Sequence, residues 1–92
     1  MTSYNVLNNR RTCECYELIE GILRQEWGFA GMVTSDWHGP CNQEHMIIAG
    51  NDVRMPRGFP DVLRETLLHK RLRREHFAVC AKRILEMILK LD

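Results

Sequence analysis

The chain is 92 residues long, which is enough for one small domain and too short for two. Hydrophobic residues make up 45% and charged residues 27%, so we expect a folded, soluble segment rather than a disordered chain or a membrane-spanning apolar run. The formal net charge of +1 gives no reason to expect a nucleic acid or a membrane as partner. One basic cluster at 70–74 lies between two helix-like segments, and we interpret it as a solvated connection.

The first third of the chain alternates between extended and helical patterns. A short strand is predicted at 1–4, where Thr and Tyr favour extended structure and an Asn/Arg-rich stretch follows. Apolar residues recur at helical spacing over 14–27, Gly28 is the predicted stop, and 32–34 is a predicted buried strand. The apolar face of the helix contains Leu18, Ile19, Ile22 and Leu23, and the opposite face contains Glu17, Glu20, Arg24 and Gln25.

The remaining elements follow in the same alternation. Residues 38–44 contain Gly and Pro and indicate a loop, whereas 46–49 fit either the end of a short helix or the start of a strand. A strand is predicted at 51–55, a helix at 61–69 and a second, amphipathic helix at 77–91 that needs a partner for its apolar face. The predicted apolar stripes are Val62, Leu63, Thr66 and Leu67 in the first helix, and Phe77, Cys80, Ala81, Ile84, Met87, Ile88 and Leu91 in the second.

This order of elements predicts an α/β fold. Strands that alternate with helices favour parallel pairing through crossover helices. A parallel sheet normally needs both faces covered, and a complete barrel of such units needs roughly 250 residues. The chain therefore has room for only about three strand-helix units.

Four cysteines are present, and we predict that all of them are reduced thiols, because their spacing is not that of a disulfide framework. Cysteines and histidines are also the ligand types that tetrahedral zinc prefers. The potential ligands are Cys13, Cys15, His38, Cys41 and His45. Their spacing argues against a zinc site, because Cys-x-Cys lacks the usual two-residue separation and the other ligands are irregularly spread.

Three stretches carry motifs that occur together in one known family. They are Met1-Thr2-Ser3-Tyr4-Asn5, the block LRQEWGFAGMVTSDW at 23–37, and AGNDVRMP at 49–56. The block resembles the "LR-EWGF-G-V-SDW" signature of family 3 glycoside hydrolases, the β-glucosidases and their relatives, and the third stretch resembles their "AG-D-MP" motif. The resemblance covers most of the chain. It implies that 1–92 is a single segment from the C-terminal part of the catalytic barrel domain, hence a partial (β/α) barrel.

The same resemblance implies roles for four residues. Asp36 corresponds to the catalytic nucleophile of a retaining mechanism, at the C-terminal end of a barrel strand, where such barrels build their active sites. Trp37 corresponds to a residue that packs against the sugar, and Tyr4 matches a tyrosine that lines the glucose subsite. Met1 is a further candidate for the pocket lining. No cofactor or metal is implied, because two carboxyl groups suffice for the chemistry.

Each of these residues also has an ordinary structural interpretation. Without the motif, Asp36 is a turn or helix-cap residue, Trp37 belongs to the core and Tyr4 is a half-buried strand residue. We interpret Asp52 as a structural carboxylate satisfied by backbone donors, despite its place in a motif. His38 and His45 are predicted surface or loop histidines, and Trp27 and Phe29 are predicted packing residues.

Part of the expected machinery is missing from the sequence. Retaining hydrolysis needs a second carboxyl group as acid/base, and nothing identifies Glu44, the closest carboxylate after Asp36, as a substitute. The chain also departs from the family pattern at Asn9, Cys15 and 69–70, which affects loop geometry and subsite contacts.

Three hypotheses follow from this partial match. The first is a fragment of a retaining β-glycosidase whose complete enzyme acts on a β-linked glucoside or oligosaccharide, and which is inactive alone. The second is a non-catalytic partial barrel that forms a homo-oligomer or docks on a complementary fragment. The third is a carbohydrate-binding remnant that uses Tyr4 and Trp37.

Overall fold

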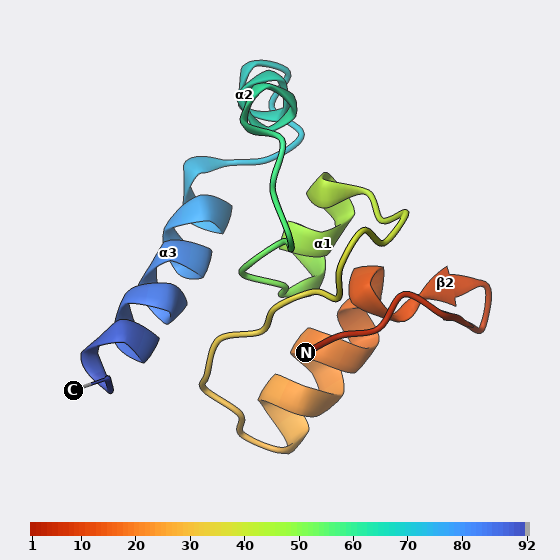
Figure 1. Cartoon of the computed structure of the whole chain (residues 1–92), viewed down its shortest axis with the longest axis vertical. Helices are drawn as coiled ribbons and strands as arrows, with labels where there is room; N and C mark the ends of the chain where they lie inside the picture. Colours follow the sequence, from red (N-terminus) through yellow and green to blue (C-terminus); the bar gives the residue numbers. More distant parts are fainter. Residues whose placement is uncertain (92) are drawn as a thin grey trace.

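Helices account for most of the regular structure in this computed structural model, which describes residues 1–91 (Figure 1). The helices predicted at 14–27, 61–69 and 77–91 are confirmed within a few residues at each end. The elements are strands β1 (Val6–Leu7) and β2 (Arg10–Arg11), the 3-10 helix η1 (Thr12–Glu14), the π-helix η2 (Glu17–Glu26), and the α-helices α1 (Gln43–Ala49), α2 (Pro60–Leu68) and α3 (Arg74–Leu89).

The three predicted strands appear as a narrow parallel ladder rather than as full strands. Thr2 forms a parallel bridge with Ser35, and Thr34 forms a second parallel bridge with Val53. The Ser35 N–H donates to the Val53 carbonyl at 2.9 Å, and the Thr2 N–H donates to the Thr34 carbonyl at 2.8 Å. The parallel order agrees with an α/β fold. The predicted strands are too long, because each pair of neighbouring segments forms a single bridge and not a continuous ladder.

The only paired strands among the described residues belong to a hairpin that the sequence analysis did not predict. β1 and β2 are antiparallel, with Val6 opposite Arg11 and Leu7 opposite Arg10. Asn8 and Asn9 form the turn at φ values of 49° and 62°. Asparagine tolerates this left-handed region better than most residues, and two such residues match the right-handed twist of a hairpin. Asn9 therefore adopts the left-handed conformation at a turn position where glycine is common.

Helix α1 resolves the ambiguity at 46–49. The Asn42 side chain accepts a hydrogen bond from the His45 N–H at 3.2 Å, which caps the first turn. Gly50 ends the helix in a left-handed conformation at φ 104°. The apolar run therefore completes a helix that begins with a capping asparagine, and periodicity alone could not reveal that start.

Helix η2 buries two charged side chains as well as its apolar face. Ile19 is buried and Leu23 packs against its cluster, as predicted. The periodicity places Glu20 and Arg24 on the face opposite the apolar residues, but that face is not exposed at these two positions: the Arg24 side chain is only 6% exposed and the Glu20 side chain 20%. Arg24 pairs with Asp52 and Glu20 pairs with Arg83, and both of these partners come from later segments of the chain. Local periodicity carries no information about such distant partners. Gly28, at φ 69°, ends the segment as predicted.

Two small apolar clusters form the core. One contains Cys13, Cys41 and Met46 with Tyr4 packed against it, and the other contains Ile19, Val33 and Ala49 with Leu23. Much of α2 and α3 lies outside these clusters. In the predicted stripes, Val62, Leu67, Met87, Ile88 and Leu91 are exposed.

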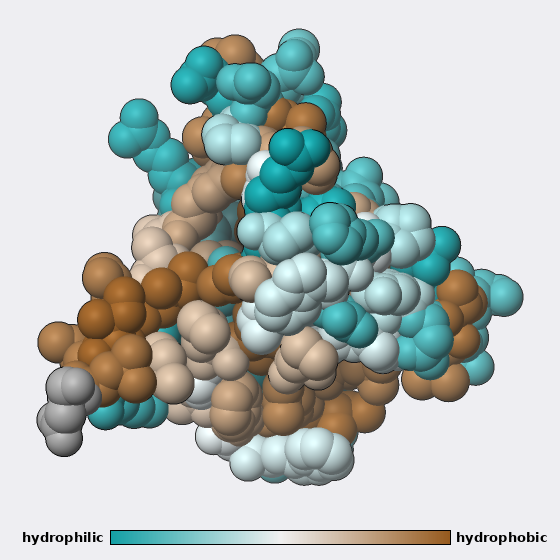
Figure 2. Space-filling model, viewed as in Figure 1, coloured by the Kyte–Doolittle hydropathy of each residue, from teal (hydrophilic) through white to brown (hydrophobic). Residues whose placement is uncertain are grey.

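Helix α3 leaves much of its apolar surface uncovered. Figure 2 shows hydrophobic side chains gathered over the C-terminal end of this helix. Among residues 1–91, no helix combines the length and the apolar character that crossing a membrane requires.

Candidate active site

The end of the parallel ladder positions Asp36. Its backbone N–H donates to the Thr2 carbonyl at 3.1 Å, so the residue continues the extended course of Thr34 and Ser35. Its carboxylate Oδ1 accepts a hydrogen bond from the Trp37 N–H at 2.7 Å, and the chain turns away there. Ser35 is buried, and its hydroxyl accepts from the Met55 N–H at 2.9 Å. The carboxylate therefore stands on a fixed backbone at the carboxyl end of three parallel segments, the edge on which α/β folds build their sites.

Tyr4 and Asp36 line the same depression of the surface. A shallow depression is lined by Tyr4, Ser35, Asp36, Gly39, Cys41, Met46, Arg54 and Met55. The Tyr4 ring lies so close to Gly39 that a Cβ atom there would come within 2.4 Å of the ring Cδ1. No water-sized molecule fits in the depression. Two predicted site residues are thus brought together, but the space for a sugar ring is absent.

Trp37 and Met1 lie at the surface and do not line this depression. The Trp37 residue is 48% exposed and Met1 is 78% exposed. The alternative interpretation of Trp37 as a core residue is therefore wrong. The indole directly after the carboxylate therefore presents an apolar face to solvent.

Arg54 is a site residue that the sequence analysis missed. Its guanidinium donates to the Cys41 carbonyl at 3.0 Å and to the Gly39 carbonyl at 3.4 Å. It also lies 4.7 Å from the Phe59 ring centroid, a cation–π distance. Arg54 holds the loop after Asp36 in place and adds a positive charge to the wall of the depression. A signal was present, because a strand at 51–55 turns alternate residues to one side, but nothing local showed which loop Arg54 would meet.

Asp52 supports the segment that leads to Asp36. Its Oδ2 accepts from the Val33 N–H at 2.8 Å and from Arg24 at 2.9 Å, and its Oδ1 accepts from Arg83 at 3.2 Å. Arg83 also reaches Glu20 Oε1 at 3.0 Å. The Asp52 side chain is fully buried. The prediction of a structural carboxylate is confirmed, although two arginines supply most of its donors and the backbone supplies one.

Among the residues that line the depression, Asp36 is the one carboxylate. Glu44 is bound to Arg71 at 2.9 Å. Glu14 accepts from the Asn42 backbone N–H and lies 3.4 Å from His45 Nδ1. Within the described part of the chain, the depression therefore offers a potential nucleophile and no partner acid, and acid/base catalysis of glycoside cleavage requires that partner.

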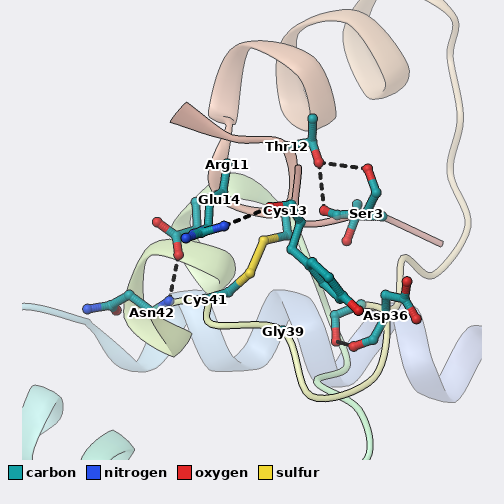
Figure 3. The surroundings of a disulfide bond; sticks show 12 residues. Ser3, Arg11, Thr12, Cys13, Glu14, Asp36, Gly39, Cys41 and Asn42 are labelled. Atoms are coloured by element: carbon teal, nitrogen blue, oxygen red, sulfur yellow. Dashed lines mark hydrogen bonds between the residues drawn. A yellow bond between two sulfur atoms is a disulfide. The ribbon is translucent and has the colours of Figure 1, made fainter. Parts of the chain in front are cut away.

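A disulfide joins Cys13 and Cys41 beneath the site (Figure 3). The prediction of four reduced thiols is therefore wrong for these two residues and right for Cys15 and Cys80. The sequence spacing was uninformative, because the two cysteines are 28 residues apart and meet only when η1 packs against α1. The bond ties the loop that follows Asp36 to the segment that follows the hairpin.

Comparison with known proteins links the chain to one group of enzymes. No family model matches it. It is 43% identical over 72 residues to β-glucosidase A of Butyrivibrio fibrisolvens, a match that covers 78% of this chain and 9% of that protein. It is 41% identical over 68 residues to a probable β-glucosidase K of Emericella nidulans, covering 74% of this chain and 8% of that protein. The chain thus spans less than a tenth of the length of these relatives.

Solved structures agree with the sequence matches. β-Glucosidase 3B of Thermotoga neapolitana, in complex with α-D-glucose, superposes with a TM-score of 0.85 at 32% identity, over 90% of this chain and 13% of that one. The GH3 β-glucosidase of Bifidobacterium adolescentis gives a TM-score of 0.86 at 26% identity, over 95% of this chain and 13% of that one. The short ladder and the helices around it therefore follow the arrangement in a part of those larger folds.

Proposed function

Because this chain is related to the β-glucosidases of glycoside hydrolase family 3 over most of its length, we propose that it is the nucleophile-bearing segment of a retaining β-glycosidase. In this proposal, 1–92 is one segment of a barrel domain, and the parallel ladder corresponds to neighbouring strands of that barrel. Asp36 is the nucleophile, Tyr4 and Trp37 contact the sugar, and Met1 lies at the edge of the same subsite. The substrate is a β-linked glucoside or oligosaccharide.

The position of Asp36 at the carboxyl end of the ladder, with Tyr4 beside it, is the observation that carries this proposal. In the retaining reaction the Asp36 carboxylate attacks the anomeric carbon, and the bond to the leaving oxygen breaks as an acid protonates that oxygen. Water, deprotonated by the same acid/base group, then hydrolyses the glycosyl ester and restores the carboxylate. Asp36 supplies the electron pair. Another part of the complete enzyme supplies the proton.

The chain alone is inactive in this proposal. Two observations support that statement: no second carboxylate lines the depression within residues 1–91, and the Tyr4 ring packed on Gly39 leaves no room for a sugar. Nucleophilic attack without protonation of the leaving group is slow, because an alkoxide is a poor leaving group. A partner segment that supplies the acid would also have to open the subsite.

The second hypothesis, a partial barrel that docks on a complementary fragment or on its own copy, is compatible with the first. Its support is the apolar surface of α3, where Leu85, Ile88 and Leu89 are exposed (Figure 2). Apolar patches of this kind mark sites of association. Light scattering at micromolar concentration tests it, and a well-folded monomer with no bound partner would count against it.

The third hypothesis, a carbohydrate-binding remnant, depends on Tyr4 and Trp37 alone. The exposed indole supports it, and the closed depression argues against it. Titration calorimetry with glucose and cellobiose discriminates: the absence of heat removes this hypothesis and leaves the first untouched.

Two measurements test the main proposal. A 2-deoxy-2-fluoro glucoside with a good leaving group should label Asp36 in the complete enzyme, and peptide mass spectrometry that finds the label on another residue would overturn the assignment. The purified 92-residue chain and its Asp36→Ala variant should release nitrophenol from an aryl β-glucoside at the same background rate. Because nitrophenolate leaves without an acid, an Asp36-dependent rate in the chain alone would contradict the closed subsite.

A further inference from the structure

Three potential metal ligands meet under the loop that follows Asp36, and a fourth lies beside one of them. They come from three separate elements: Cys13 and Glu14 from η1, Cys41 from the loop, and His45 from α1. The ligand atoms of Cys13, Glu14 and Cys41 all lie within 4.8 Å of one another. His45 lies outside that group of three, with its Nδ1 3.4 Å from Glu14 Oε2, so a rotation of its exposed side chain is needed to bring it to the sulfurs (Figure 3 shows the other three).

One separation already matches the edge of a tetrahedron around a small cation, and the two bonded sulfurs must move apart on reduction to match it. Zinc binds sulfur at about 2.3 Å and nitrogen or oxygen at about 2.0–2.2 Å, so two donors in one tetrahedral shell lie roughly 3.3–3.8 Å apart. The Glu14–His45 separation of 3.4 Å is already in that range. Two cysteines, one histidine and one carboxylate are also ligand types that zinc accepts.

Neighbouring groups hold these ligands in place. Asn51 donates from its amide to the Cys13 carbonyl, and Arg54 donates to the Cys41 carbonyl at 3.0 Å. The second oxygen of Glu14 accepts from the Asn42 N–H. Such outer contacts orient ligands before a metal arrives and strengthen binding. Cys13 and Cys41 are almost fully buried, so little water competes for the site.

An opening leads from solvent to the same place. A cavity of about 270 Å³ is lined by Glu14 and His45, together with Arg10, Tyr16, Ile48 and Ala49. The cation can therefore reach the carboxylate and the imidazole from this cavity, which neither cysteine lines.

We propose that, once the Cys13–Cys41 disulfide is reduced, Cys13, Glu14, Cys41 and His45 form a tetrahedral site for a divalent cation of the zinc class. A thiol or phosphine reductant supplies two electrons, and the two sulfurs take up two protons and become thiols. Binding of Zn²⁺ then releases both protons to solvent, and the resulting thiolates, the neutral imidazole and the carboxylate hold the ion. The cation replaces the covalent link between η1 and the loop with a coordinate one.

Cysteines 28 residues apart and a histidine on a different helix do not resemble a zinc motif, so the sequence argued against a site. These four ligands differ from the potential zinc ligands that the sequence offers, which also include Cys15 and His38 and lack Glu14. The fold gathers Cys13, Cys41 and His45, adds Glu14, and leaves Cys15 beside Glu17, with Cys15 Sγ 3.4 Å from Glu17 Oε2. The inference does not depend on the proposed glycosidase function, since no step of it involves a sugar.

Cobalt binding tests the site directly. The full chain, reduced with a phosphine and stripped of metal, is titrated with Co²⁺ and followed by visible and near-ultraviolet absorption. We expect one Co²⁺ per chain, the visible bands of tetrahedral cobalt and a thiolate charge-transfer band, all displaced by one equivalent of Zn²⁺. The oxidised chain should show none of these bands. Absence of the bands in the reduced chain, or their persistence in the oxidised one, overturns the proposal.

Variants separate this site from adventitious binding. Cys41→Ser should abolish the charge-transfer band or weaken it strongly, and His45→Ala should raise the Kd for Zn²⁺ at least tenfold. His45 is exposed, so its removal leaves the fold intact, which circular dichroism checks even if Cys41→Ser unfolds the chain. Cys80→Ser is the matched control and should bind like the wild type. Unchanged affinity in His45→Ala, or a loss in Cys80→Ser, contradicts the assigned ligands.

Discussion

Replacing Asp52 with alanine removes the acceptor at the centre of the buried charge network. The Asp52 carboxylate accepts three hydrogen bonds, from the Val33 N–H, Arg24 and Arg83, at 2.8, 2.9 and 3.2 Å. The variant leaves two arginines near the core with only Glu20 between them. The contacts to Asp52 connect η2, the parallel ladder and α3, so losing them should lower the free energy of unfolding of the whole chain.

The expected cost follows from burial. Removing one partner of a buried ion pair costs about 3–5 kcal/mol, because an uncompensated charge stays behind. Glu20 still compensates part of the positive charge here, so we expect about 3 kcal/mol, the low end of that range. Small domains have a total free energy of unfolding of only about 5–15 kcal/mol, so the variant should be marginal at 25 °C.

Urea denaturation followed by circular dichroism measures the loss. Asp61→Ala is the matched control, because Asp61 is 95% exposed and its carboxylate lies 3.8 Å from Arg64, so its removal should leave the urea midpoint unchanged. The reasoning is refuted if Asp52→Ala and Asp61→Ala shift the midpoint equally, or if Asp52→Ala loses less than about 1 kcal/mol, the worth of one ordinary hydrogen bond.

Three further perturbations test other parts of the structure. Gly39→Ala should displace the Tyr4 ring, because the added Cβ would lie within 2.4 Å of Cδ1, and should lower the melting temperature; an unchanged near-ultraviolet tyrosine signal would argue against the contact. Reducing Cys13–Cys41 in the absence of metal should lower stability by about 3–4 kcal/mol on the loop-entropy model for a separation of 28 residues, and equal melting temperatures with and without reductant would contradict the bond. Burial and the Asp52 charge raise the pKa of the Cys80 thiol to about 12, so iodoacetamide at pH 8 should label Cys15 and spare Cys80, as peptide mass spectrometry can check. Since the unfolded thiol ionises near pH 9 and the folded one near 12, stability should fall as pH rises between these values, and in Cys80→Ser this part of the decline should be absent.

Features that depend on neighbours in the chain were accessible from the sequence. The apolar spacing of η2, α2 and α3 predicted each helix, because a helical face repeats within a few residues and reports its own period. Gly28 marked a chain turn because a left-handed φ favours glycine. The alternation of extended and helical stretches predicted parallel pairing, which the ladder bears out in direction but not in length.

Features that depend on distant partners were decided only by the tertiary structure. Glu20 and Arg24 turn inward because they pair with Arg83 and Asp52. Arg54 binds the loop after Asp36, and Cys13 bonds to Cys41, which lies 28 residues further along the chain. Charge, thiol and guanidinium groups satisfy one another through space, so their local pattern says little about where they point. The sequence alone determined where Asp36 stands in a family motif. The fold decided that Tyr4 lies beside it, that Arg54 shares its wall and that no second carboxylate within residues 1–91 reaches the depression.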